Sequence, residues 1–167
     1  DEKARLELEL DIKEMTAMLD SYVNFVRTEA PEPIENISIN EIIKDIFKNI
    51  NQDNYKIVLE EKDKIKTSGR PLQIKRAFQN IIDNSLRYSK KIKISIKSVE
   101  EGCQIIFDDD GPGIPKEERK KVLLPFYRIE NSRNRNTGGV GLGITIASDI
   151  IHNHGGDLLL EESPEKG

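Results

Sequence analysis

Three short stretches of the chain carry residue types that together suit nucleotide chemistry. A carboxylate in a glycine turn can accept a hydrogen bond from the exocyclic amine of a base. Paired Asn amides can hold a metal ion, and glycines let phosphates approach the backbone. In chain order these stretches are Asn80–Asn84, Asp109–Gly113 and Gly139–Gly143. Their residue types predict a single nucleotide site assembled from distant segments.

The first stretch places two amides on one helix. Asn80 and Asn84 are four residues apart, so both project the same way from a helix. Ile81 and Ile82 lie between them and are expected to face the core, which turns the Asn pair toward a cleft. Amide oxygens are hard ligands suited to Mg²⁺. Taken alone, the pair could equally be two solvated surface residues, although Asn is a poor helix former.

The second stretch is acidic and leaves a predicted strand. Asp109 stands directly before the turn that contains Gly111 and Gly113, where a carboxylate could read an adenine amine. An ordinary hairpin end or a calcium loop is the alternative. The EF-hand pattern is absent, because no ligands continue at its alternate spacing.

The third stretch is a glycine run that leads into an apolar helix, an arrangement that can bind anions through backbone N–H groups. No Lys-Ser/Thr pair follows it, as a Walker A loop requires, and a long polar loop precedes it, unlike a Rossmann fingerprint. This loop, residues 126–138, carries Arg128, Arg133 and Arg135. It could be a lid with charges for phosphate, or a solvated charge run.

Length and composition favour one domain with an appendage. The chain has 167 residues, of which 34% are charged and 5% aromatic, so a modest core of Ile and Leu is expected. The net charge of −4 argues against nucleic acid as the main partner. No apolar run approaches the ~20 residues of a membrane span, so we expect no membrane contact from these residues. Because the chain starts without Met and within a helical pattern, we expect it to belong to a longer protein.

Residues 1–30 predict a long helix, and residues 31–37, with Pro31 and Pro33, a linker. The helix repeats apolar residues every 3.5 positions, the seam of a helical bundle that needs a hairpin mate or a second copy. This seam comprises Leu8, Ile12, Met15, Leu19, Tyr22 and Val26.

Residues 38–167 alternate helical and strand patterns. Helices are expected from a Ser38 cap through Ile50, from Pro71 through Leu86 with Leu72 on its inner face, over 116–124 and over 144–151. Strands are expected at 55–60, 65–69, 91–97, 104–107 and 158–160. The fold class predicted is α/β (α+β): a two-layer sandwich whose mixed, mostly antiparallel sheet carries helices on one face and lysines on the other.

Taken in order, these segments resemble the catalytic, ATP-binding domain of sensor histidine kinases, which has the GHKL or Bergerat fold. Asn80–Asn84 is similar to the N box and Asp109–Gly113 to the G1 box. Phe126 with Arg128 is similar to the F box, and Gly139–Gly143 to the G2 box. The stretch 108–114 is most like that of the EnvZ-like osmosensor branch.

The resemblance implies a role for each matched residue. Asp109 would bind the adenine amine, Tyr88 would pack beside the ring, and Asn84 would ligate Mg²⁺ with support from Asn80. Catalytic positions would be Asn80, Arg87 and Arg128. The remaining nucleotide contacts would come from Gly111, Gly113, Ile114, Gly139, Gly141, Leu142 and Gly143.

The same resemblance implies the reaction and the partners. ATPases of this fold place a Glu where this chain has Asn80, and an amide cannot act as the general base for water. The chain is therefore expected to keep ATP for transfer to a histidine. That histidine would lie on the first helix of a dimerisation hairpin, outside this sequence, as would the last strand of the family. A homodimer through the N-terminal helix, a response regulator partner and a cytoplasmic location below an inner-membrane receptor are implied. A degenerate nucleotide-binding scaffold or a GHKL ATPase are the alternatives.

Overall fold

The computed structural model describes residues 32–50, 54–129 and 140–163, together with scattered positions between residues 2 and 23. The predicted bundle helix therefore lies largely outside the described residues, as do Arg133, Arg135 and Gly139. Within the described part of its seam, Leu8, Ile12, Met15 and Leu19 are all exposed.

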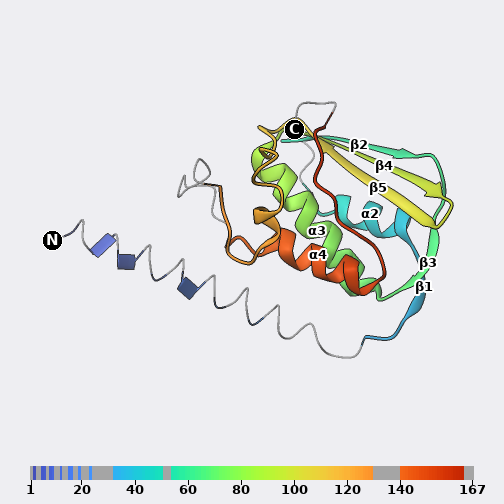
Figure 1. Ribbon diagram of the computed structural model, residues 1–167, viewed down its shortest axis with the longest axis horizontal. Coiled ribbons are helices and arrows are strands. Elements are labelled where there is room, and N and C mark those ends of the chain that lie inside the picture. The colour runs from blue at the N-terminus through green and yellow to red at the C-terminus, as the bar shows by residue number, and fades with distance from the viewer. Residues whose placement is uncertain are drawn as a thin grey trace.

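Helices and strands alternate in an α/β arrangement, in which α2, α3 and α4 lie on one side of a three-stranded sheet (Figure 1). The strands are β1 (Glu35–Ser38), β2 (Lys56–Glu61), β3 (Lys66–Gly69), β4 (Lys91–Val99) and β5 (Gly102–Asp109). The helices are α2 (Ile39–Phe47), α3 (Pro71–Tyr88), the 3₁₀ turn η1 (Lys121–Leu123) and α4 (Gly143–Asn153).

The central sheet has the order β2-β4-β5 and is mixed. β2 runs parallel to β4 with Ile57 opposite Ile92, whereas β4 and β5 form an antiparallel hairpin with Ile94 opposite Phe107. A separate antiparallel pair joins β1 to β3. The sequence predicted the hairpin, but it gave no sign of the parallel β2–β4 pairing, which depends on the long helical crossover between these strands.

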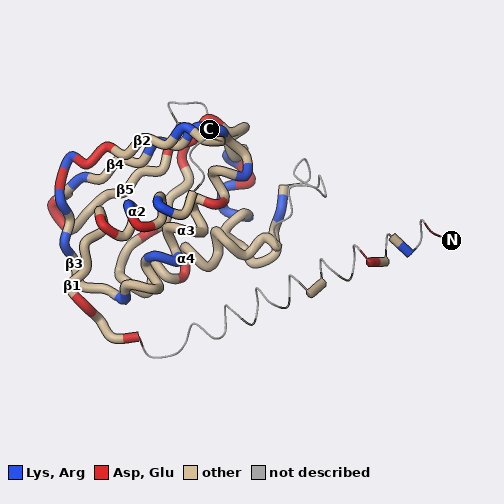
Figure 2. The backbone as a smooth tube through the Cα atoms, turned by 180° about the vertical axis from the view of Figure 1, so that it is seen from behind, with Lys and Arg blue, Asp and Glu red and all other residues tan. Residues whose placement is uncertain are grey.

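Alternation along β4 separates the core from the lysine-rich face. Ile92, Ile94 and Ile96 are fully buried, while the residues that alternate with them, Lys91, Lys93, Ser95 and Lys97, are only half-buried. Lys93 Nζ lies 3.0 Å from Glu60 Oε1 on the neighbouring strand, and basic and acidic residues mix along this sheet (Figure 2). The predicted two-sided strand is confirmed, with its apolar face against α2 and α3.

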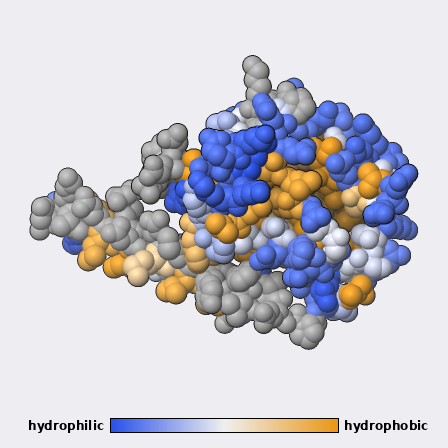
Figure 3. Space-filling view, viewed as in Figure 1, coloured by the Kyte–Doolittle hydropathy of each residue, from blue (hydrophilic) through white to orange (hydrophobic). Residues whose placement is uncertain are grey.

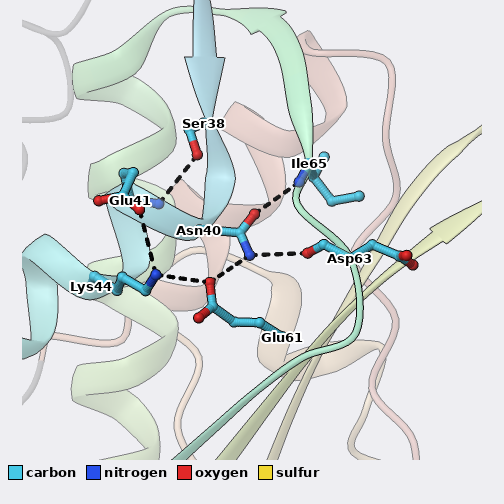
Figure 4. Close-up of polar contacts among 7 residues, drawn as sticks. All are labelled: Ser38, Asn40, Glu41, Lys44, Glu61, Asp63 and Ile65. Carbon is cyan, nitrogen blue, oxygen red and sulfur yellow. Dashed lines mark hydrogen bonds and ion pairs between the residues drawn. The ribbon is translucent and has the colours of Figure 1, made fainter.

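A buried asparagine fixes the turn between β2 and β3. Asn40, at the start of α2, is 2% exposed. Its Nδ2 donates to Glu61 Oε1 at 2.7 Å and to the Asp63 carbonyl at 3.0 Å, and its Oδ1 accepts from the Ile65 N–H at 2.8 Å (Figure 4). Because every polar atom of the amide is bonded, the burial costs little.

Ser38 caps α2, as predicted, with its Oγ accepting from the Glu41 N–H at 3.4 Å. Lys44 joins the same network through Glu61, at 3.1 Å (Figure 4). The Asn40 and Lys44 hydrogen bonds hold the pKa of the Glu61 carboxyl below its usual range.

Four local predictions were wrong. Residues 116–124 form turns and the short η1 instead of a full helix, because the run 116–121 is charged and offers no apolar face. Residues 158–160 form no strand; Leu158 packs against α3 and α4 instead. Leu72 is 71% exposed, since it lies two residues, about 200° around the helix, from buried Ile74. Strand β1 forms where a linker was expected, through its pairing with β3.

No helix among the described residues is both long and apolar enough to cross a bilayer.

Candidate functional site

The α3–α4 helix pair brings the predicted Asn pair to the predicted phosphate loop. A Cβ placed on Gly143, the first residue of α4, would lie 3.8 Å from Asn80 Oδ1. Asn80 is half-buried, and its Nδ2 is a buried donor without a hydrogen-bond partner among the described residues. Asn84 lies one turn further along α3 and is also half-buried. Both Asn side chains are therefore less open than the sequence suggested, and Asn80 lies beside the N-terminus of α4.

The N-terminus of α4 has features of an anion site. Its N-cap Leu142 provides no side-chain cap, and its first turn carries no acidic residue. Thr145, in this first turn, is 7% exposed and its Oγ1 has no partner among the described residues. Backbone N–H groups at such an end attract negative charge. Sequence patterns did not single out Thr145, because only its burial makes its hydroxyl unusual.

The three consecutive aspartates have separate surroundings. Asp108 and Asp109 end β5, and Asp109 Oδ1 accepts from the Gly111 N–H at 3.0 Å. Asp110 Oδ1 instead accepts from the N–H groups of Lys90 and Lys91, at 3.0 and 2.9 Å. These two backbone hydrogen bonds lower the pKa of the Asp110 carboxyl. Asp110 therefore ties the turn to the segment between α3 and β4, and Asp109 is the aspartate that the sequence predicts to contact a base.

Gly111 is required for close packing at this corner. The residue is buried, and a Cβ on it would lie 2.8 Å from Asp109 Oδ1 and 3.4 Å from the Tyr88 carbonyl oxygen. The end of α3, with Arg87 and Tyr88 exposed, thus meets the acidic turn at this glycine. Gly113 has φ 71°, which glycine adopts without strain. Ile114 follows it, and its carbonyl accepts from Arg119 Nε at 3.1 Å.

The glycine run also contacts the start of the predicted lid. Gly141 has φ 77°, and a Cβ on it would lie 3.0 Å from the carbonyl carbon of Phe126 and from the Tyr127 carbonyl oxygen. The Phe126 N–H donates to the Gly141 carbonyl at 3.0 Å. Phe126 itself has φ 63° and is 52% exposed. The half-buried Arg128 follows two residues later, so the F-box and G2-box segments meet directly.

Tyr127 anchors this segment to η1. Its hydroxyl donates to Glu118, whose other carboxylate oxygen lies 2.9 Å from Lys121 Nζ. The hydrogen bond from Tyr127 is the main cause that lowers the pKa of Glu118, and the Lys121 contact is the second. The same hydrogen bond raises the pKa of Tyr127. No sequence pattern indicated this contact, which joins residues nine apart across an irregular turn.

A shallow hollow of about 340 Å³ lies beside this corner and includes Arg87, Tyr88 and Asp110. Its lining does not include Asn80, Asn84, Asp109 or the glycines. The face that carries α3 and α4 has an apolar area bordered by hydrophilic side chains (Figure 3).

Of the predicted site residues, the structure brings Asn80 and Gly143 together, Asp109 with Gly111 and Tyr88, and Gly141 with Phe126. Gly139 lies outside the described residues. His154 accepts from the Arg70 N–H through Nε2 at 3.1 Å, and its Nδ1 lies 2.7 Å from the Ile150 carbonyl.

The fold and this corner define an ATPase domain of one family. The profile described as "Histidine kinase-, DNA gyrase B-, and HSP90-like ATPase" matches residues 69–167, more than half of the chain. The chain belongs to this family.

Within it, the similar proteins are sensor kinases. The sensor histidine kinase CpxA of Escherichia coli is 41% identical over 100 residues, which are 59% of this chain and 22% of the relative. GtrS of Pseudomonas aeruginosa is 28% identical over the whole chain, which spans 34% of that relative. The chain thus spans 22% of the length of one of these relatives and 34% of the other.

Solved structures agree on the fold. The histidine kinase domain of the E. coli osmosensor EnvZ is 31% identical, with a TM-score of 0.57, over 82% of this chain and 85% of that domain. The ATP binding domain of PrrB from Mycobacterium tuberculosis has a TM-score of 0.67 at 22% identity, covering 81% of this chain and 92% of that one. The predicted histidine kinase resemblance is confirmed, including the similarity to EnvZ.

Proposed function

We propose that this chain is the kinase core of a longer sensor histidine kinase, which transfers the γ-phosphoryl group of ATP to a histidine on a dimerisation hairpin. The observation that carries this proposal is the contact of Asn80 with Gly143 at the N-terminus of α4. An amide stands at the position where a water-activating ATPase needs a carboxylate base. ATP held there would keep its γ-phosphoryl group until another nucleophile attacks it.

The described residues fit ATP. Asp109 has Oδ1 bonded to Gly111, and its second carboxylate oxygen can accept from the adenine amine. Asn80 Nδ2 and Thr145 Oγ1 are buried donors without partners among the described residues. Asn80 lies beside the first turn of α4, and Thr145 belongs to that turn. Buried polar groups are normally paired, so two unpaired donors at a helix N-terminus suit phosphate oxygens. Ile114 and Leu142 would contact the base, and Arg87, Arg128 and Gly139 the phosphates.

Asn84, with support from Asn80, would hold Mg²⁺ through its amide oxygen. When bound, the ion would neutralise charge on the phosphate oxygens. The described residues contain no cluster of three or more His, Cys, Asp or Glu side chains that could hold a metal. An amide and phosphate oxygens are therefore the suitable ligands.

Transfer would be an in-line displacement. A ring nitrogen of the histidine would bond to the γ-phosphorus while the bond to the bridging oxygen of ADP breaks, and ADP would leave with that electron pair. The protein would contribute mainly positioning and charge neutralisation, as is general for phosphoryl transfer.

Titration of the chain with ATP and Mg²⁺, followed by addition of the histidine-bearing hairpin, tests the proposal. Asp109→Asn keeps an acceptor for the Gly111 N–H but replaces the second oxygen with a donor, so ATP binding should weaken by about tenfold or more. Equal binding by this variant would overturn the adenine assignment. Binding without transfer would favour a nucleotide-binding scaffold, and steady Mg²⁺-dependent phosphate release would favour an ATPase.

The partners follow from the same proposal. The exposed seam residues Leu8, Ile12, Met15 and Leu19 would be covered by a hairpin mate and a second copy. A response regulator would receive the phosphoryl group, and the core would lie on the cytoplasmic side of an inner-membrane receptor.

A further inference from the structure

Helix α3 begins with a cap supplied by a distant residue. Its N-cap residue Arg70 makes no side-chain cap, and its first turn contains no acidic residue. Glu32, before β1, supplies the missing acceptors. Its Oε1 accepts from the Leu72 N–H at 2.6 Å, and its Oε2 accepts from the Gln73 N–H at 3.1 Å. These are the N–H groups that a local Ser, Thr or Asp cap would otherwise satisfy.

The backbone of the linker is held at the same point. Arg70 Nε donates to the Glu32 carbonyl at 3.2 Å, so both the carboxylate and the backbone carbonyl of Glu32 accept hydrogen bonds from the start of α3. The N–H of Arg70 in turn donates to His154 Nε2 at 3.1 Å, and His154 Nδ1 contacts the Ile150 carbonyl. One continuous set of hydrogen bonds therefore joins the linker, the start of α3 and the end of α4. We call Glu32, Arg70 and His154 the linker clamp.

The clamp is at the opposite end of the helix pair from the nucleotide residues. Asn80 lies ten residues beyond Arg70, about 15 Å along the axis of α3. There it contacts Gly143 at the start of α4, while the clamp contacts the end of α4. α3 and α4 pack against each other around Ala77, Ile146 and Ile150, and α3 also packs against the sheet through Ile74 and Phe78. The linker is therefore hydrogen-bonded to the same packed body that carries the Asn80–Gly143 corner.

We propose that Glu32 is a positioning residue that couples the segment before the domain to the α3–α4 pair, and so sets how the nucleotide site is presented to the histidine hairpin. The part of this inference that concerns transfer rests on the proposed function. A cap shifts the equilibrium at a helix start by about 2- to 30-fold. A movement of the segment before Glu32 could therefore break or restore it, whereas a cap at position 70 itself would not respond to the linker.

Amide hydrogen exchange tests the clamp directly. In Glu32→Ala, the amides of Leu72 and Gln73 should exchange roughly fivefold faster, while the dissociation constant for ATP stays within about twofold. Glu35→Ala, which removes an exposed carboxylate from the same segment, is the matched control and should change neither. Unchanged exchange in Glu32→Ala would show that the cap does not hold in solution and would overturn the inference.

Phosphoryl transfer separates positioning from helix stability. The double variant Glu32→Ala with Arg70→Ser gives α3 a local cap but leaves the linker unattached. It should recover slow exchange at Leu72, while transfer within the full-length protein remains altered by about threefold or more. When the hairpin is supplied as a separate molecule, the double variant should transfer phosphoryl groups to it at the same rate as the unaltered chain does. If the double variant restored normal transfer within the full-length protein, Glu32 would be only a structural cap. If the unaltered protein transferred no phosphoryl group in either arrangement, both the proposed function and the positioning role of Glu32 would be contradicted. Hydrogen exchange would still show whether Glu32 caps α3 in solution.

Discussion

Asn80 of α3 lies against Gly143 of α4, with the Asn80 Oδ1 3.8 Å from the position of a Cβ on residue 143. This contact brings two sequence segments more than sixty residues apart to one point. A Cβ on residue 143 would make only an ordinary van der Waals contact at 3.8 Å, so an alanine side chain has room there. Gly143 and Gly141 therefore differ in the space available to a side chain, although both belong to one glycine run.

Gly141→Ala should destabilise the domain by roughly 1–3 kcal/mol, because an alanine at φ 77° is strained and its Cβ would press on the Phe126 and Tyr127 backbone. Gly143→Ala should cost less than about 1 kcal/mol. Urea denaturation of both variants gives the comparison. Equal losses would mean that the Gly141 contacts with Phe126 and Tyr127 are not formed in solution.

Asn80→Ala should leave the unfolding free energy within about 1 kcal/mol of the unaltered chain, because the lost Nδ2 has no partner among the described residues. ATP binding should nevertheless weaken by about tenfold or more. Calorimetric titration and thermal unfolding of one preparation would measure both. Asp83→Ala, on an exposed position of α3, is the control, and a similar loss of binding there would point to a general effect on the helix.

Asp110→Ala should lower stability at neutral pH, because Lys90 and Lys91 lose their acceptor. The folded pKa of this carboxyl is below its unfolded value, so its contribution is complete above about pH 4 and is lost as the pH falls through the folded pKa. The stability difference between variant and unaltered chain should therefore shrink as the pH falls below about 4. Denaturation curves at neutral and acidic pH would show it. A difference independent of pH would contradict the assignment of these bonds to the ionised carboxylate.

Asn40→Ala should destabilise the domain by about 1–3 kcal/mol, since the buried Ile65 N–H loses its acceptor. The matched control is Asn49→Ala, an exposed asparagine just after the same helix, which should change stability by less than about 0.5 kcal/mol. Chemical denaturation of the two variants measures the contrast. If Asn49→Ala were the more damaging change, the network in Figure 4 would not be the source of stability.

Local patterns predicted most elements because their causes are local. The Ile92, Ile94 and Ile96 alternation defines a strand with one buried face, and Pro71 marks the first turn of α3. Where the pattern was weak, the prediction failed. Residues 158–160 are apolar enough for a strand, but Leu158 packs on the helix pair instead of pairing with a strand.

The residue types of the candidate site were recognisable in the sequence: two amides one helical turn apart, a carboxylate before glycines, and a glycine run before a helix. These residue types determine which ligands can be bound. The tertiary structure decided which contacts the individual residues make. Only folding shows that Asp110 binds the backbone of Lys90, twenty residues earlier, and that Glu32 caps α3. The physical reason is that such contacts join residues far apart in the chain, whose meeting depends on how whole helices and strands pack.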